Sequence, residues 1–180
     1  MELASDILLI SVVFFIVLYN VYLFIYLRNS FRKLPYVPIR LEDIPRLITI
    51  ADIKGEKIFY DLGSGDGRVL IGFARAHKEL ACSGYEISSF YVFVTNLKAR
   101  LNRLKNCRAK KADMFTVDVS DADIVYVYPN PKFAKLINEK ILKNLKKGTK
   151  VISYCFPIVG LTPTKTSDIY GKREIFLYKI

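Results

Sequence analysis

The sequence predicts an α/β domain with a mostly parallel central sheet, preceded by one transmembrane helix. From residue 41 onward, short apolar runs that end in turn residues alternate with helical patterns, as in a parallel sheet covered by helices. The first 28 residues differ, because residues 7–27 contain no charged side chain. We therefore divide the chain into an anchor at residues 1–28, a linker at residues 29–40 and a domain at residues 41–180.

The uncharged stretch is long enough for a membrane span. At 1.5 Å per residue, a helix over residues 7–27 is about 32 Å long, which matches the hydrocarbon core of a bilayer. A cleaved signal peptide fits poorly, because no basic residue precedes the stretch. A buried core helix is the alternative. Arg28, Arg32 and Lys33 follow the stretch, so the positive-inside rule predicts a single-pass protein with its N-terminus outside and its domain on the cytoplasmic side.

The anchor carries three tyrosines on one side, Tyr19, Tyr22 and Tyr26. They form either an aromatic belt at the membrane interface or a packing face for a partner helix, to which Asn20 would add a hydrogen bond.

Charge and composition narrow the partners. The net charge is +11, and all 28 Lys and Arg residues follow residue 27. A basic domain of this kind favours anionic partners, which are an anionic membrane surface or, second, a nucleic acid. Three scattered cysteines and a single histidine offer no metal-type spacing, so we expect no metal site.

A glycine-rich turn organises the rest of the domain. An apolar strand at residues 57–60 is closed by Asp61, and Gly63, Gly65 and Gly67 follow at alternate positions. A dinucleotide fingerprint would need a glycine at residue 68, where Arg68 stands. The Gly-Lys-Ser/Thr ending of a P-loop is also missing. Asp61 would repel a phosphate and attract an ammonium group, so the turn suits a cationic ligand.

This pattern is similar to motif I of the class I S-adenosylmethionine-dependent methyltransferases. The resemblance implies a Rossmann-like class I methyltransferase domain and S-adenosyl-L-methionine as cofactor. It assigns Asp61, Gly63, Gly65 and Gly67 to the binding of that cofactor.

The next two strands also end near acids. A helix at residues 41–51, starting near Pro45, precedes the glycine turn, and a helix at residues 68–77 follows it. A strand at residues 80–86 then ends at Glu86, where an acid can accept both hydroxyls of a ribose. We expect the adjacent Ile87 to contact the cofactor as well.

A third strand at residues 107–111 is followed by Asp113 and Met114. We expect Asp113 to bind the exocyclic amine of adenine and Met114 or Phe115 to lie against the ring. Between the second and third strands, Ser88 or Ser89 can cap a helix over residues 90–105. The apolar residues of this helix share one face: Phe90, Val94, Leu97, Leu101 and Leu104.

The C-terminal third completes the sheet. A fourth strand at residues 122–128 leads into Tyr128-Pro129-Asn130-Pro131, and a basic helix follows at residues 132–145. The remaining strands are expected at residues 150–156, 165–169 and 174–180. The ligand of such a sheet lies at the carboxyl ends of its parallel strands.

A closer resemblance covers residues 35–180. Pro35-Tyr36-Val37-Pro38, the run from Asp61 to Arg68, and Ser153-Tyr-Cys-Phe-Pro157 resemble a small family of protein lysine methyltransferases. Its known animal members are mitochondrial enzymes that methylate the ATP synthase c subunit and the adenine nucleotide translocase. The resemblance implies an enzyme that methylates the ε-amine of protein lysines. The segment Tyr128–Pro131 departs from the Asn-Pro-Pro-Tyr motif of amino-adenine methyltransferases, which disfavours a nucleic-acid base.

Tyr128 and Asn130 are our candidates to orient the acceptor amine. Tyr36 and Pro129 are the candidates for substrate contacts. Three alternatives remain: a nucleic-acid methyltransferase, a lipid or quinone methyltransferase, and a membrane scaffold with a vestigial cofactor fold. Salt-dependent RNA binding would indicate the first, and an apolar funnel toward the membrane would indicate the second. The intact acids and glycines argue against the scaffold.

Overall fold

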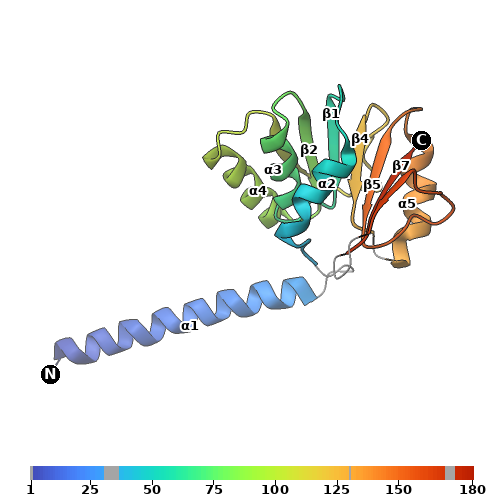
Figure 1. Cartoon of the computed structure of the whole chain (residues 1–180). Coiled ribbons are helices and arrows are strands. Elements are labelled where there is room, and N and C mark those ends of the chain that lie inside the picture. The colour runs from blue at the N-terminus through green and yellow to red at the C-terminus, as the bar shows by residue number, and fades with distance from the viewer. Residues whose placement is uncertain (1, 31–36, 130, 169–172) are drawn as a thin grey trace. The chain divides into compact units, whose positions relative to one another are not determined.

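The computed structural model describes residues 2–30, 37–129, 131–168 and 173–180. By their internal contacts the residues form two units, 1–37 and 38–180. The first unit contains one long helix, α1 (Glu2–Ser30) (Figure 1). Within it, Asp6–Leu23 is long and apolar enough to cross a membrane.

The polar side chains in the middle of α1 are bonded within the helix. Ser11 Oγ donates to the carbonyl of Ile7, and Asn20 Nδ2 donates to the carbonyl of Ile16, both at 2.8 Å. Such bonds to the preceding turn lower the cost of placing polar groups in lipid. α1 is therefore compatible with a bilayer despite these two residues.

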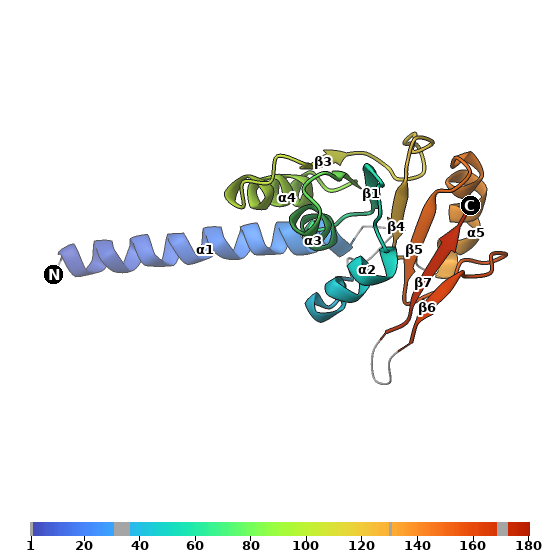
Figure 2. The ribbon, with the colours of Figure 1, turned by 45° about the horizontal axis from the view of Figure 1, so that its top comes forward.

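The second unit is built on a seven-stranded sheet with the order β3-β2-β1-β4-β5-β7-β6 (Figures 1 and 2). Strands β1 to β5 run parallel to one another, and β7 is antiparallel to both β5 and β6. The strands are β1 (Ile58–Leu62), β2 (Ala81–Glu86), β3 (Cys107–Lys111), β4 (Ile124–Val127), β5 (Lys150–Tyr154), β6 (Lys165–Ser167) and β7 (Ile175–Lys179). The predicted α/β fold with a mostly parallel sheet is confirmed.

Helices cover both faces of this sheet. One buried cluster joins α2 (Ile44–Ala51), α3 (Arg68–Ala76) and the inner side of α4 (Ser89–Leu101) to one face. In it, the rings of Phe59 and Phe73 stack with centroids 4.3 Å apart. A second cluster packs α5 (Ala134–Lys140) on the other face, with Ile137 and Ile141 against Val125 and Val151. Short 3-10 turns lie at η1 (Leu41–Asp43), η2 (Pro131–Phe133) and η3 (Leu142–Asn144).

Local signals located two helix starts correctly. α2 begins at Ile44 with Pro45 in its first turn. Ser88 is the N-cap of α4, and its hydroxyl accepts a hydrogen bond from the N–H of Tyr91 at 3.4 Å. The prediction of one continuous helix over residues 132–145 was wrong, because α5 stops at Lys140 and a 3-10 turn follows. Ile141 and Leu142, at this break, are both buried.

The apolar residues of α4 do not face the core. Thr95 and Ala99 are the buried residues of this helix. Phe90, Leu97 and Leu101 are exposed, and of the predicted apolar face only Leu104, beyond the end of the helix, is buried. An apolar stripe on a surface helix normally packs inward, so α4 has the reverse orientation.

Candidate active site

The carboxyl ends of the parallel strands meet at one edge of the sheet. Leu62 pairs with Tyr85 of β2 on one side and with Val127 of β4 on the other. After β1 the chain continues outward to β2 and β3 and then returns to β4, so the connections diverge between β1 and β4. Open α/β sheets bind their ligands at such a point. Asp61, Glu86 and Tyr128 all belong to this edge.

The glycine turn closes back onto the sheet. The N–H groups of Gly63 and Ser64 both donate to the carbonyl of Tyr85, at 2.9 and 3.0 Å. Gly67, which caps α3, has a φ of +77°, and a Cβ there would lie 2.3 Å from Thr95 Cγ2 on α4. Both the left-handed backbone conformation at residue 67 and the close approach of α4 therefore require a residue without a Cβ.

Glu86 joins the second strand to this turn. Its carboxylate is 9% exposed and accepts two hydrogen bonds, from Gly65 N–H to Oε2 at 3.0 Å and from Ser88 N–H to Oε1 at 2.7 Å. A carboxylate has about four acceptor positions. Both oxygens of Glu86 therefore keep a further position for a hydroxyl donor.

Asp61 is a buried carboxyl group with an open position. It is 1% exposed, and within the described part of the chain its Oδ2 has no hydrogen-bond partner. Burial raises the pKa of Asp61 to about 8, the Leu70 backbone N–H partly offsets this, and the nearby acids Glu86 and Asp66 add to it. A cation bound at Oδ2 would oppose this shift, because a nearby positive charge favours the ionised form.

Asp66, the acid inside the turn, is already paired. Arg68 Nε lies 2.9 Å from Oδ1, and Lys98 Nζ lies 3.1 Å from Oδ2. Partial burial opposes ionisation, but the hydrogen bonds from these two cations prevail and hold the pKa of Asp66 below its usual range. Arg68 also donates from Nη1 to the carbonyl of Ile39 at 2.8 Å, which ties the start of the domain to the glycine turn.

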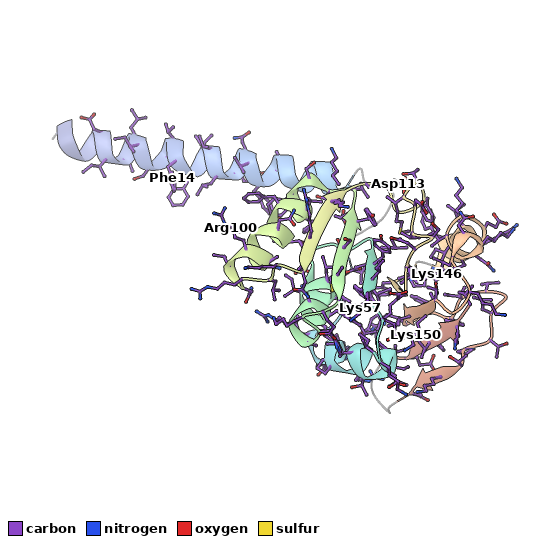
Figure 3. All side chains as sticks on the ribbon, turned by 90° about the horizontal axis from the view of Figure 1, so that it is seen from above. Phe14, Lys57, Arg100, Asp113, Lys146 and Lys150 are labelled. Atoms are coloured by element: carbon purple, nitrogen blue, oxygen red, sulfur yellow. The ribbon has the colours of Figure 1, made fainter. Side chains whose placement is uncertain are left out.

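The loop after β3 approaches the turn from the other side. A Cβ at Gly63 would lie 3.8 Å from Met114 Sδ, so Met114 is next to the first glycine. Asp113 is exposed, and its Oδ1 accepts a hydrogen bond from Phe115 N–H at 2.9 Å (Figure 3). Ile87 follows Glu86 and is 61% exposed.

Aromatic rings gather at the ends of β4 and β5. The half-buried Tyr128 ring lies edge-on to Tyr154 at 4.9 Å and roughly parallel to Phe156 at 6.5 Å. Burial, with Cys155 beside it, raises the pKa of Tyr128, so its phenol stays neutral. Pro129 is buried. Tyr36 and Asn130 lie outside the described residues.

Sequence reasoning missed the partners of Tyr128. Tyr154 donates from its hydroxyl to Asp43 Oδ2 at 2.6 Å, and Asp43 Oδ1 accepts from Arg46 Nη1 at 2.7 Å. The Tyr-Cys-Phe run at residues 154–156 was visible, but only the pairing of Val127 with Ser153 brings Tyr154 beside Tyr128.

These features suit a ligand with an ammonium group and a nucleoside. Asp61 offers a buried, partner-free oxygen to the ammonium, and Glu86 offers acceptor positions to ribose hydroxyls. Together with the 3-2-1-4-5-7-6 strand order and the antiparallel β7, they define a class I methyltransferase. S-adenosylmethionine is the cofactor of this class.

The comparison with known families is specific. Residues 61–165 match the family described as the ANTKMT methyltransferase domain. The match covers more than half of the chain, and the chain belongs to this family.

Two relatives and one solved structure show how far the similarity extends. The chain is 32% identical to a protein-lysine N-methyltransferase of Saccharolobus islandicus, over 81% of this chain and 93% of that protein. It is 27% identical to the human lysine N-methyltransferase of the ATP synthase c subunit, over 72% of this chain and 55% of that protein. It therefore spans about half the length of the human relative. An RNA methyltransferase from Salinibacter ruber in complex with S-adenosyl-L-homocysteine aligns with a TM-score of 0.74 and 29% identity, over 80% of this chain and 94% of that chain.

Proposed function

We propose that this protein transfers a methyl group from S-adenosylmethionine to the ε-amine of protein lysines, and that α1 holds it in a membrane. The observation that carries the proposal is the similarity to the Saccharolobus islandicus protein-lysine methyltransferase along nearly the whole of that enzyme. The N-terminal helix, long and apolar enough to span a bilayer, supports the membrane part.

The cofactor would be held by the acids and glycines of the sheet edge. Asp61 would accept the ammonium of the methionine moiety at its partner-free Oδ2, and Glu86 would accept the ribose hydroxyls. Gly63, Gly65 and Gly67 would let the ligand approach the backbone. On the adenine side, Asp113 would bind the exocyclic amine, with Ile87 and Met114 against the ring.

When bound, the cofactor supplies an electrophilic methyl group on a sulfonium. The protein must then deliver a neutral amine in line with that methyl and exclude water. A lysine has a pKa near 10.4, so its deprotonation at pH 7.4 costs about 4 kcal/mol. Desolvation and neighbouring positive charge reduce this cost, because both disfavour the ammonium form.

The aromatic group at β4 and β5 would provide such surroundings. Tyr128 is half-buried between Tyr154 and Phe156, and the positive charge of Arg173 acts on its hydroxyl. We propose that Tyr128 and Asn130 orient the amine, and that Tyr36 and Pro129 contact the substrate around it. The raised pKa of Tyr128 keeps its hydroxyl available as a hydrogen-bond donor or acceptor.

RNA is the second candidate acceptor. It is favoured by the Salinibacter ruber structure and by the net charge of +11. The two candidates differ in the chemistry of the labelled product, so one experiment separates them.

The test uses the full chain in vesicles, tritiated S-adenosylmethionine and membranes of the source organism. Label that protease removes and that maps to lysine supports the proposal. Label lost to nuclease overturns it in favour of RNA, and label in the organic extract overturns it in favour of a lipid or quinone. Glu86→Ala should abolish all labelling, because it removes the acceptor for the ribose hydroxyls.

A matched pair tests the role of Tyr128. Tyr128→Phe should lower kcat with little change in cofactor binding, because it removes only the hydroxyl proposed to orient the amine. Tyr126→Phe, two residues earlier in the chain and within β4, removes a buried hydroxyl that has no partner among the described residues, and it should leave kcat unchanged. Equal effects of both variants would contradict the assignment of Tyr128.

A further inference from the structure

Helix α4 presents a continuous apolar stripe on the outside of the domain. The residues of the stripe are 44–74% exposed, and they are Phe90, Phe93, Leu97 and Leu101. At 100° per residue they fall within about 80° of one another around the helix axis. Exposed apolar residues scattered singly need no explanation, whereas a contiguous row of large ones marks an interaction surface.

The inner face of α4 explains why the stripe points outward. Thr95 and Ala99, which lie opposite the stripe, are the buried residues of the helix. Thr95 Oγ1 donates to the carbonyl of Gly65 at 3.3 Å, and a Cβ at Gly67 would contact Thr95. Small residues are required here because α4 lies close against the glycine turn. The large apolar residues therefore cannot be turned inward without moving the turn.

The surroundings of the stripe are strongly basic. Residues 87–112 contain seven Lys and Arg residues and no Asp or Glu, and of the seven Lys98 is paired with Asp66 of the glycine turn. Arg100, Arg103 and Lys105 are exposed around the C-terminal end of α4, and Figure 3 shows Arg100 extending away from the domain. The charge of this surface is complementary to an anionic one.

We propose that α4 docks the domain on the surface of an anionic lipid bilayer, with Phe90, Phe93, Leu97 and Leu101 in the headgroup region and the basic residues on lipid phosphates. The inference rests on the membrane part of the proposed function. An apolar stripe with basic flanks is the pattern of a helix that lies in a membrane interface. A spanning α1 would keep the bilayer within reach, because the seven residues between Ser30 and Pro38 extend about 25 Å at most.

Other occupants fit the surface less well. A second copy in a two-fold contact would bring the same patch together, and the exposed Arg100, Arg103 and Lys105 of the two copies would repel one another. A single-stranded nucleic acid stacks its bases on aromatic rings, but half of the stripe is leucine. A bilayer accepts both the aliphatic and the aromatic side chains.

Docking through α4 would bring the active-site edge close to the membrane. α4 starts at Ser89, three residues after Glu86 at the carboxyl end of β2. The N-terminal end of the docked helix therefore lies beside the edge that carries the proposed cofactor site. Lysines near the membrane surface would be the accessible acceptors.

The test places one environment-sensitive fluorophore, carried by an unnatural amino acid, in the full chain reconstituted in vesicles. In three separate proteins, the fluorophore replaces residue 101 in the stripe, residue 159 or residue 14. Residue 159 is a control, because it is another exposed apolar side chain. Residue 14 lies in α1 and reports on the anchor. Vesicles of phosphatidylcholine with phosphatidylglycerol should shift the emission at residue 101 to the blue and let nitroxide lipids quench it. The reporter at residue 159 should stay in water.

Two variants examine the charges and the stripe. Arg100→Gln with Lys105→Gln should lower the ratio of docked to undocked reporter about 25-fold, because each basic residue near an anionic surface contributes a factor of about five. Phe90→Asn with Phe93→Asn should also release the reporter. Leu41→Asn with Val159→Asn, which changes two exposed apolar residues elsewhere, should not release a reporter at residue 101.

Each other outcome overturns the docking proposal. If the reporter at residue 101 stays in water while the reporter at residue 14 is shielded, docking through α4 is rejected but the membrane anchor is not. Water exposure at both positions rejects the anchor as well. Shielding at residue 101 that is equal without phosphatidylglycerol assigns α4 to a site within the chain. Shielding that grows with the protein-to-lipid ratio assigns α4 to a contact with a second copy. Shielding that needs added RNA assigns α4 to nucleic acid.

Discussion

At the scale of single residues, the candidate site depends on polar groups that the protein leaves incompletely satisfied. Asp61 is buried with one oxygen that has no partner in the described part of the chain, and its pKa is raised to about 8 because burial disfavours the charged form. Glu86 is buried too, but two backbone N–H groups bind its oxygens. The two acids thus differ in what they still lack, which is a cation for Asp61 and hydroxyl donors for Glu86.

Asp61 should make the protein without cofactor less stable as the pH rises. Between about pH 4 and pH 8 the folded chain keeps a proton on Asp61 that the unfolded chain has lost, so the free energy of unfolding falls across this window. Asp61→Asn removes the titration and should flatten the profile. Urea unfolding of both proteins from pH 5 to pH 8.5 measures the effect. An equal slope in the two proteins would show that Asp61 ionises normally.

The same carboxyl should couple cofactor binding to proton release. A bound ammonium favours the ionised form, so affinity should rise from about pH 6 to pH 7.5 with one proton leaving Asp61. Asp61→Asn should lower affinity about 10- to 100-fold at pH 7.5, the value of a hydrogen bond between charged groups. Calorimetry in two buffers of different ionisation heat counts the proton. Unchanged proton release in Asp61→Asn would contradict this role.

Gly67 should tolerate no side chain. A Cβ there would meet Thr95 at 2.3 Å on a backbone with φ of +77°, so we expect Gly67→Ala to lose about 1–3 kcal/mol from backbone strain alone, plus the cost of the contact. Adding Thr95→Gly should recover the contact part. Gly55, whose Cβ would meet nothing within 4 Å, provides the control: Gly55→Ala should leave the midpoint of thermal unfolding nearly unchanged.

At the scale of the elements, a buried polar network fixes α2 to the C-terminal strands. Asp43, 0% exposed, accepts from Tyr154 at the end of β5 and from Arg46 in α2. Arg46 also donates to the carbonyls of Ser167, at the end of β6, and Arg173, just before β7. The network therefore links the aromatic group around Tyr128 to an element on the sheet face, through side chains rather than backbone.

Breaking this network should be costly. Arg46→Met leaves the buried Asp43 carboxylate without its 2.7 Å partner, and removing one member of a buried pair costs about 3–5 kcal/mol. Lys54→Met breaks an exposed pair with Asp52 and should cost far less, because solvent screens exposed ion pairs. Denaturant unfolding of the two variants compares them. Similar losses would mean that Asp43 is satisfied by its other contacts.

At the scale of the whole molecule, charge is distributed unevenly along the chain. The basic residues all follow residue 27, and Arg28, Arg32 and Lys33 come directly after the candidate span. This distribution is the basis of the predicted orientation, with the N-terminus outside and the domain on the cytoplasmic side. The division into an anchor, a linker and a domain at residues 28 and 40 stays a prediction. The structure itself groups the residues into two units, 1–37 and 38–180.

Reversing the flanking charges should invert the topology. Glu2→Lys with Asp6→Lys, combined with Gln at residues 28, 32 and 33, moves the positive end to the other side of the span. The readout is a cysteine added at the N-terminal end and an impermeant maleimide. In the protein with native charges, this cysteine should react in intact cells. In the protein with reversed charges, it should react only after lysis. Reaction that is independent of the charges would mean that the folded domain, rather than the flanks, sets the orientation.

The sequence by itself determined what depends on neighbours along the chain. Alternating apolar runs predict the strands and helices, the spacing of Gly63, Gly65 and Gly67 predicts the turn, and the lack of charge in residues 7–27 predicts the long apolar helix. These signals are local, so they can be read without knowing the fold. The break after Lys140 was missed because no glycine or proline stands there to mark it.

Only the tertiary structure decided what residues far apart in the chain do together. Strand register brings Tyr154 and Phe156 to Tyr128, and packing buries Asp43 against Tyr154. The sequence did not determine whether the α4 stripe points toward the sheet or away from it. A helical pattern shows that apolar residues share one face of a helix, but it does not show which face meets the sheet. That choice follows from the space between Thr95 and the glycine turn, which only the folded chain defines.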